Sequence, residues 1–287
     1  MATRPRLSVL VLTKDEEKNL PRCLASVRWA EQIVVVDSFS TDRTPDLVRA
    51  HGAELVRHPF ESYARQRNWA LEALAWRGDW ILILDADEAV TPDLREEMEA
   101  RLADDPAEAG FYVNRRVYFL GKWIRHCGWY PNWSLRLFRK GRAHYDDRPV
   151  HEHLAVEGPV AYLRGELVHD NRKGLTAFLE KHNRYASLEA AARLAEDRRR
   201  GLLASLPDLM SPPLRRRTLK RELWPFVPAH PLAFFLYSYV LQRGFLDGPT
   251  GLLFCLLMSA HELNIDLKMR ELRQAKAKEA VRKLRAA

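Results

Sequence analysis

Short, continuous runs of Val, Ile and Leu alternate with helical patterns over the first hundred residues of this 287-residue chain. Apolar runs without regular polar interruptions are typical of parallel strands, because helices cover both faces of a parallel sheet. The alternation therefore predicts an α/β half-domain of the nucleotide-binding type. The expected strands are residues 7–12, 32–36, 54–56 and 80–84, and the expected helices are residues 16–30, 44–51 and 62–76.

The pattern changes at Gly110, where strand-like segments are separated by loops that contain Gly and Trp. These segments predict a mixed or antiparallel extension of the sheet. After Arg172, apolar and aromatic residues recur at helical spacing, which predicts a long helix. We therefore expect an α/β chain with a nucleotide-binding half over residues 1–110, a second half over residues 111–172 and a helical region over residues 173–287.

Composition excludes several classes of protein. Hydrophobic residues make up 47% of the chain and charged residues 29%, which is too apolar for a disordered protein. The three cysteines are widely spaced, which fits neither a disulfide framework nor a zinc knuckle. Since the first residues lack the sections of a secretion signal, we expect a cytoplasmic protein.

The net charge of +8 favours an anionic partner. Basic clusters at residues 198–200, 215–217 and 220–221 precede two apolar segments, residues 231–241 and 252–260. Each apolar segment is shorter than the roughly 20 residues of a membrane-spanning helix. The sequence predicts peripheral binding to the inner face of the cytoplasmic membrane. The alternative is that these apolar residues pack in the core or against a second subunit, and the oligomeric state is left open.

Polar residues follow three of the expected strands. Thr13 comes after the first strand, Asp37 after the second, and Asp85-Ala86-Asp87 after the strand at residues 80–84. Ligands of open α/β sheets bind at the carboxyl ends of the strands, so these residues should meet at one edge. Two carboxylates separated by one small residue suit Mg²⁺ or Mn²⁺, which prefer oxygen ligands. The alternative is a solvated turn that caps the helix beginning near Thr91.

Four segments, in order, resemble the successive signatures of family 2 inverting glycosyltransferases: residues 10–17, 34–44, 66–68 and 84–88. Later segments resemble the branch that includes lipopolysaccharide core β-glucosyltransferases, namely residues 133–139, 150–152, 181–185 and 244–248. The resemblance reaches about Lys268 and departs from the family at Ser38-Phe39, where a small residue or Gly is common beside Ser. It implies a GT-A fold, in which a Rossmann-like half carries a mixed central sheet, followed here by the helical region.

The resemblance also implies roles for individual residues. Thr13, Asp37 and Arg67 would hold the nucleotide, Asp85 would contact ribose or the metal, and Asp87 would bind the metal. The fixed donors of Arg67 suit a diphosphate, although this arginine is also compatible with the exposed face of its helix. His169 follows an apolar strand and is assigned to the metal, because GT-A enzymes often use a late histidine in this way; the alternative is a structural histidine.

Inversion at a sugar carbon requires a base that takes the proton of the acceptor hydroxyl. The candidates are Glu152, Asp146, Asp147 and Asp170, and Glu152 is chosen because residues 150–152 occupy the place of the family's acidic base. The alternative role for Glu152 is an ion pair with a nearby arginine. Aromatic residues in the same half predict either a platform for the acceptor sugar or a small satellite core: Trp123, Trp129, Tyr130 and Trp133.

Taken together, the sequence predicts a metal-dependent transferase that moves a hexose, with glucose favoured, from a UDP-sugar to a lipid-linked saccharide such as the lipopolysaccharide inner core. A nucleic-acid-binding protein that uses the basic clusters is the first alternative, although the chain has no recognisable reader motif. A non-catalytic, saccharide-binding GT-A relative is the second alternative.

Overall fold

The computed structural model describes residues 6–146, 154–196 and 230–286. The chain divides into two compact units, and each is described by itself. Unit 1 comprises residues 1–125 and 129–175, and unit 2 comprises residues 126–128 and 176–287. The boundaries that the sequence predicts at residues 110 and 172 stay predictions.

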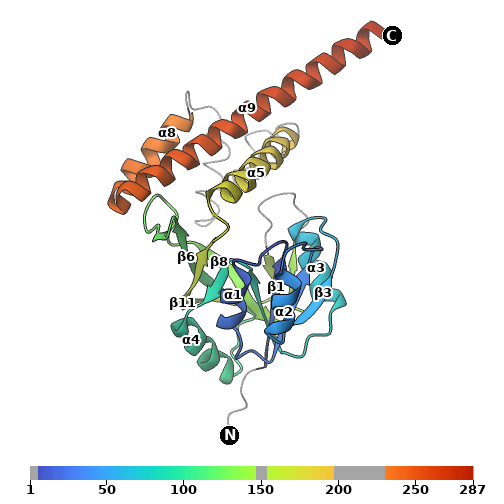
Figure 1. Cartoon of the computed structure of the whole chain (residues 1–287), viewed down its shortest axis with the longest axis vertical. Helices are drawn as coiled ribbons and strands as arrows, with labels where there is room; N and C mark the ends of the chain where they lie inside the picture. Colours follow the sequence, from blue (N-terminus) through green and yellow to red (C-terminus); the bar gives the residue numbers. More distant parts are fainter. Residues whose placement is uncertain (1–5, 147–153, 197–229, 287) are drawn as a thin grey trace. The chain divides into compact units, whose positions relative to one another are not determined.

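The first half of unit 1 is a parallel sheet centred on β1 (Leu7–Thr13) (Figure 1). β1 pairs in parallel with β2 (Gln32–Asp37) on one side and with β4 (Trp80–Asp85) on the other, and β3 (Glu54–Arg57) extends the sheet beyond β2. The register aligns Thr13 with Asp37 and Leu12 with Asp85. The polar ends of the three strands therefore lie at the same edge, as the sequence predicts.

The second half of unit 1 makes the sheet mixed. β8 (Trp133–Arg139) is antiparallel to both β4 and β6 (Gly110–Phe119), and β11 (Val160–Asp170) returns parallel to β6. β5 (Glu88–Val90) pairs antiparallel with the end of β11, and the two-residue β7 (Lys122–Trp123) pairs with β6. The resulting order is β3-β2-β1-β4-β8-β6-β11-β5. This mixed sheet on a Rossmann-like half confirms the expected GT-A fold class.

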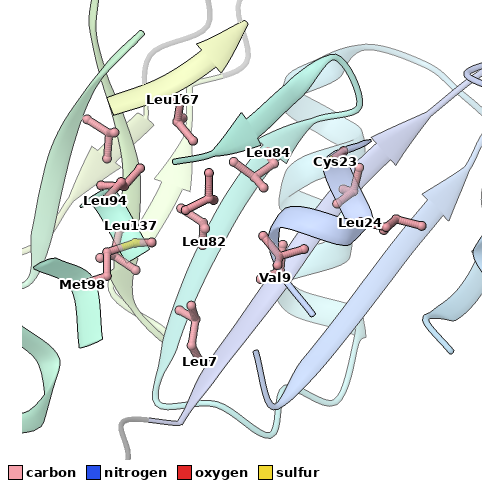
Figure 2. Close-up of a cluster of buried hydrophobic side chains, with 14 of the residues drawn as sticks. Leu7, Val9, Cys23, Leu24, Leu82, Leu84, Leu94, Met98, Leu137 and Leu167 are labelled. Atoms are coloured by element: carbon pink, nitrogen blue, oxygen red, sulfur yellow. The ribbon is translucent and has the colours of Figure 1, made fainter. Parts of the chain in front are cut away.

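Two layers cover the sheet. One face packs against α1 (Leu20–Ser26), α2 (Thr44–Ala50) and α4 (Pro92–Ala103). Figure 2 shows part of this core, where Val9 and Leu82 of the sheet lie among Leu24 of α1 and Met98 of α4. The other face packs against α3 (Tyr63–Ala73) and the small hairpin of β9 (Ala143–Tyr145) and β10 (Leu154–Val156). Burial on both faces explains the continuous apolar runs.

The predicted helix over residues 16–30 is wrong in its extent, because only Leu20–Ser26 are helical. Residues 13–19 form a loop whose backbone amides bond to the loop after β2. The amide of Asp15 donates to Ser40 Oγ, and the amide of Glu16 donates to Thr44 Oγ1, each at 2.8 Å. These bonds between distant segments compete with the helical ladder for the first residues.

Unit 2 is helical, which confirms the expected C-terminal helical region. Its elements are α5 (Leu175–Glu196, all but its first residue in this unit), α8 (His230–Leu236), the π-helical turn η3 (Tyr237–Leu241), the 3-10 turn η4 (Gly244–Asp247) and α9 (Gly248–Ala286). Ala186 and Ala190 of α5 pack against Ile265 of α9. His230 Nδ1 lies 2.8 Å from an oxygen of Asp266, so α8 and α9 share a buried polar contact as well.

Among the described residues, no helix is both long enough and apolar enough to cross a membrane. This agrees with the short apolar segments predicted at residues 231–241 and 252–260. The basic clusters at residues 198–200, 215–217 and 220–221 lie outside the described residues.

Candidate functional site

The carboxyl ends of β1 and β2 form the first part of the candidate site. Asp37 is fully buried, and its carboxylate accepts hydrogen bonds from the amide and hydroxyl of Ser40 and from Thr13 Oγ1. Ser38 Oγ accepts from Gln66 of α3 at 2.7 Å. Thr13 and Asp37, both predicted to hold the nucleotide, are thus brought together. The loop that follows Asp37 is held by hydrogen bonds from β1, from its own residue Ser40 and from α3.

The two loops above this edge also hold each other. The amide of Thr41 donates to the Asp15 carboxylate at 2.7 Å, and the amide of Glu17 donates to Asp42 at 3.1 Å. Phe39 has a φ of 59°, in the left-handed region, and its side chain is 51% exposed. An exposed aromatic ring on a strained loop at the sheet edge is the feature that departs from the family pattern.

Asp85 is the centre of a cluster of ion pairs. One of its oxygens accepts from Arg67 at 2.8 Å and the other from Arg136 at 2.7 Å. Arg136 also donates to Glu88 at 2.7 Å. Burial opposes ionisation of Asp85, but the charges of Arg136 and Arg67 outweigh it and hold the pKa of Asp85 well below its usual range. Asp85 is therefore a carboxylate with both oxygens engaged by guanidinium groups.

The alternative that Arg67 lies on the exposed face of its helix is wrong, because Arg67 is only 7% exposed. It lies between the rings of Tyr63 and Tyr145, with its guanidinium carbon 5.5 and 5.1 Å from the two ring centroids. Aromatic faces stabilise a desolvated guanidinium. Arg67 therefore reaches the site from a fixed position on α3.

Arg136 is a site residue that the sequence analysis quoted in a motif without giving it a role. It is 4% exposed and bridges Asp85 and Glu88, which lie on two other strands. Arg115 reaches the same Glu88 at 3.4 Å. The signal in the sequence was an arginine within the apolar strand segment Leu135–Phe138, because a charge at such a position requires a buried partner.

Asp87 and His169 form the second cluster. His169 Nε2, at the end of β11, lies 3.2 Å from an oxygen of Asp87. Burial disfavours the imidazolium, but the charge of Asp87 outweighs it and raises the pKa of His169. Arg22 of α1 donates to the backbone oxygens of Asp87 and Asp170, which fixes this corner. The alternative of a solvated turn is wrong, because Asp87 is 6% exposed and Thr91 caps α4 through the amide of Leu94.

The residues present fit a hard divalent cation. Neighbouring ligands of an octahedral ion at about 2.1 Å are separated by about 3.0 Å, close to the distance between His169 Nε2 and Asp87. The other ring nitrogen of His169 is buried without a hydrogen-bond partner among the described residues. No set of three or more candidate ligands from His, Cys, Asp and Glu occurs in the described part of the chain. Such a pair suits an ion that takes its remaining ligands from water and substrate phosphates.

The predicted base, Glu152, lies outside the described residues, as does the alternative candidate Asp147. Glu152 therefore stays a prediction. Of the other candidates, Asp170 pairs with Arg22 at 3.6 Å and with Arg172 at 3.1 Å. Asp146 lies 3.9 Å from His144 at the end of the β9 strand.

Three of the four aromatic residues predicted as a platform or a satellite core can be placed by their contacts. Trp123 packs edge to face against Tyr130, with Arg116 and Arg125 over its ring, as in a small satellite core. Trp133 is 40% exposed and lies against Tyr162 of β11, with ring centroids 4.9 Å apart. Trp133 and Tyr162 thus present exposed aromatic surface.

The chain was compared with known proteins. Residues 8–156 match the family model described as glycosyl transferase family 2. The chain is similar to the lipopolysaccharide core biosynthesis glycosyltransferase LpsC of Rhizobium meliloti, with 32% identity over 200 residues that cover 67% of this chain and 73% of the relative. It is also similar to an uncharacterized glycosyltransferase of Rickettsia prowazekii, with 32% identity over 64% of this chain and 67% of that protein.

Among solved structures, S. aureus TarS 1–349 in complex with UDP is 15% identical, covers 94% of this chain and 92% of that chain, and has a TM-score of 0.49. The glucosyl-3-phosphoglycerate synthase of Mycobacterium tuberculosis with Mn²⁺ and UDP-glucose is 22% identical, covers 40% of this chain and 45% of that chain, and has a TM-score of 0.34. The family assignment depends on the sequence matches, which cover half of the chain or more. The chain belongs to glycosyl transferase family 2 and is a glycosyltransferase.

Proposed function

We propose that this protein transfers a hexose, with glucose favoured, from a UDP-sugar to a lipid-linked saccharide of the lipopolysaccharide inner core, with inversion at the sugar carbon. The observation that carries the proposal is one edge of the sheet, where three strands end. Asp37 ends β2, the Arg-held Asp85 ends β4, and Asp87, which follows β4, pairs with His169 near the end of β11. A nucleoside diphosphate needs hydrogen-bond acceptors at one end and positive charge at the other, and this edge offers both.

On the donor side, the nucleoside end of the UDP-sugar binds at Thr13 and Asp37, and Arg67 binds its diphosphate. Asp85 holds Arg67 and Arg136 in place, and each guanidinium has fixed donors suited to phosphate oxygens. Asp87 and His169 would hold a Mg²⁺ or Mn²⁺ ion, with Asp85 beside them. The ion would neutralise charge on the leaving diphosphate.

On the acceptor side, the base proposed is Glu152, for the reason given by the family resemblance. Its carboxylate takes the proton of the acceptor hydroxyl while the nucleoside diphosphate leaves from the opposite face of the sugar. The similarity to LpsC, a lipopolysaccharide core biosynthesis glycosyltransferase, supports a lipopolysaccharide core saccharide as the acceptor class. Glucose as the transferred sugar rests on the resemblance to the β-glucosyltransferase branch.

We further propose that the protein works in the cytoplasm, at the inner face of the membrane, because a lipid-linked acceptor is presented there. Unit 2 supports this with large apolar side chains that are about half exposed or more on α8, the two turns and α9: Leu232, Leu236, Leu241, Phe245, Leu246 and Leu253. Large exposed apolar patches mark interaction surfaces. The alternative is that a second copy of this chain, and not the membrane, covers these apolar side chains.

The proposal is tested by mixing the purified full-length protein with UDP-glucose, Mn²⁺ and a deacylated lipopolysaccharide core oligosaccharide. We expect stoichiometric UDP release and a product heavier by one hexose, with both lost on adding EDTA. Parallel reactions with UDP-galactose and UDP-N-acetylglucosamine rank the donor sugar. Salt-sensitive binding of DNA or RNA without release of UDP from any donor would instead favour the nucleic-acid-binding alternative.

A further inference from the structure

Unit 1 contains a cavity of about 680 Å³ whose lining includes neither Asp87 nor His169. It forms between α4 and the edge of β11, at the place where the pairing of β11 with β6 shifts between Tyr162 and Glu166. Its lining includes Tyr162, Arg164 and Glu166 of β11, Arg116 of β6, and three residues of α4, which are Asp93, Glu97 and Arg101. The volume lies within the usual range for pockets that bind small molecules.

The backbone of this irregular strand is already satisfied, so the pocket is preformed. Glu97 accepts hydrogen bonds from the amides of Arg164 and Gly165, at 2.8 and 2.7 Å, and Thr91 Oγ1 donates to the carbonyl of Glu166 at 2.8 Å. Each buried amide or carbonyl without a partner would cost about 1–3 kcal/mol, so these bonds fix the strand in its bulged shape. Glu97 therefore serves to hold the strand, and the wall of the cavity that it shapes does not depend on a ligand.

The floor of the cavity is a fixed polar network. Glu166 is 7% exposed and accepts from Asn114 at 2.7 Å and from the hydroxyl of Tyr130 at 2.8 Å, and it pairs with Arg116. In contrast, the exposed side chains of Asp93, Arg101 and Arg164 have no ion pair or hydrogen bond to another described residue. The open groups of the lining thus include both donors and an acceptor.

An aromatic platform borders the cavity. Tyr162 is 57% exposed, is stacked on Tyr112 with ring centroids 4.9 Å apart, and meets the edge of Trp133. The exposed part of the Tyr162 ring presents a flat apolar surface, which matches the C–H face of a pyranose ring.

From this combination we infer that the cavity is a saccharide subsite that holds sugar units of the acceptor beyond the one that reacts. The lining carries three guanidinium groups and three carboxylates, so its charge is balanced. A ligand rich in hydroxyl groups, which both donate and accept, fits such a lining better than a phosphate does, because a phosphate requires excess positive charge. The inference rests on the proposed function for the identity of the saccharide as an acceptor.

The position along β11 agrees with this role. Glu166 precedes His169 by three residues, which is about 10 Å along a strand. Arg116, which also lines the cavity, pairs with Val168, the neighbour of His169. The cavity therefore extends along β11 toward the pair of Asp87 and His169, where it can hold a neighbouring sugar of the same saccharide.

The test measures equilibrium binding of soluble oligosaccharides to the full-length protein without donor, by calorimetry and by tryptophan fluorescence. The probes are a deacylated lipopolysaccharide core oligosaccharide, its terminal monosaccharide, and inorganic phosphate. We expect the oligosaccharide to bind at least tenfold more tightly than the monosaccharide, and phosphate not to compete.

Two matched pairs of variants locate the binding. Tyr162→Ala should weaken oligosaccharide binding about three- to tenfold, whereas Tyr162→Phe, which keeps the ring, should retain it. Arg164→Ala should weaken binding, whereas Arg49→Ala, on the exposed surface of α2, should not. The substituted side chains are solvent-exposed, so unchanged melting temperatures are expected.

Transfer kinetics provide the second readout. Tyr162→Ala should raise the KM for the oligosaccharide acceptor and leave the KM for the UDP-sugar unchanged. Oligosaccharide binding that is absent in the wild type, or unaffected in both Tyr162→Ala and Arg164→Ala, would overturn the subsite even if UDP is released. Binding that is intact without any UDP release would instead contradict the proposed function and leave the subsite standing.

Discussion

At the residue scale, the site is organised by a few charged side chains that have little contact with water. Arg136, at 4% exposure, has a carboxylate of β4 on one side and one of β5 on the other. Removing one partner of a buried ion pair leaves an uncompensated charge, which is far more costly than losing a surface pair. Arg136 is therefore a structural requirement of the site.

Arg136→Met should lower the free energy of unfolding by about 3–5 kcal/mol at pH 7, because Asp85 and Glu88 lose their shared partner. The pKa of Asp85 is lowered in the folded state, so its ion pairs stabilise the fold above its unfolded pKa of about 3.9 and lose that effect as the pH falls. Urea titrations at pH 7 and at about pH 2.5, well below the unfolded pKa of Asp85, should show a smaller difference between variant and wild type at the lower pH. Arg49→Ala is the control, and an equal loss in both variants would contradict a buried role.

Asp87→Asn should reduce hexose transfer to the level without enzyme and leave the melting temperature within a few degrees of the wild type. The substitution removes one ligand charge from the proposed cation position beside His169. UDP release, measured over a range of Mn²⁺ concentrations, checks this. Asp46→Asn, on the exposed surface of α2, should retain full turnover, and wild-type turnover by Asp87→Asn would rule out the assignment.

The sequence placed Thr13, Asp37, Asp85 and Asp87 correctly at the strand ends, because each polar residue ends or closely follows an apolar run and the carboxyl ends of parallel strands meet at one edge. It gave no partner for Arg136, because that contact requires β8 to pair antiparallel with β4, across about fifty residues of chain. Non-local pairing of this kind has no periodic signal in one sequence.

At the element scale, the contact between β11 and α4 is set by a glycine. A Cβ on Gly165 would lie 2.3 Å from the Cα of Leu94 and 2.7 Å from its nitrogen, so the strand and the helix approach too closely for any side chain. Backbone atoms cannot turn away as side chains can. Gly165 is thus the residue that allows α4 to cover the sheet beside the cavity.

Gly165→Ala should therefore destabilise unit 1 by about 1–3 kcal/mol or more, because α4 must shift. Gly110→Ala is the matched control on the neighbouring strand β6. Its added Cβ would meet the side-chain ends of Leu135 and Val156 at 3.3 Å, and these can move aside. Urea denaturation followed by circular dichroism compares the two variants. A Gly110→Ala protein that loses as much stability as Gly165→Ala would contradict this account.

The elements themselves were predictable where their signal was strong. Strands at residues 7–12 and 80–84 came from unbroken apolar runs, and each is one residue longer in the structure, because the polar residue that follows still pairs with its neighbour. The helix expected at residues 16–30 failed at its start, where side chains from the loop after β2 bond the amides of Asp15 and Glu16.

At the scale of the whole molecule, the sequence predicted a helical region after the α/β sheet, and unit 2 confirms it. Within unit 2, a buried ion pair joins two of the helices: Arg193 of α5 donates to Glu262 of α9 at 3.2 Å, and Glu262 is 4% exposed. The exposed apolar side chains of α8 and α9 have no comparable contact among the described residues of unit 2. Periodicity predicts that a helix has an apolar face, and it cannot tell whether lipid or protein covers that face.

A flotation experiment distinguishes lipid from protein as the partner of the exposed apolar side chains of α8, α9 and the two turns between them. Full-length protein should float with liposomes that contain anionic lipid, at low salt, and should release as salt is raised, because basic residues are each worth about 1 kcal/mol near such a surface. Leu241→Glu combined with Phe245→Glu should abolish flotation, since these side chains are 71% and 48% exposed and would enter the headgroup boundary. Leu179→Glu on α5 is the control for an added charge at an exposed leucine. A dimer in sedimentation that dissociates in the Leu241→Glu, Phe245→Glu protein, together with no binding of the wild type to anionic liposomes, would assign the surface to a second copy of the chain.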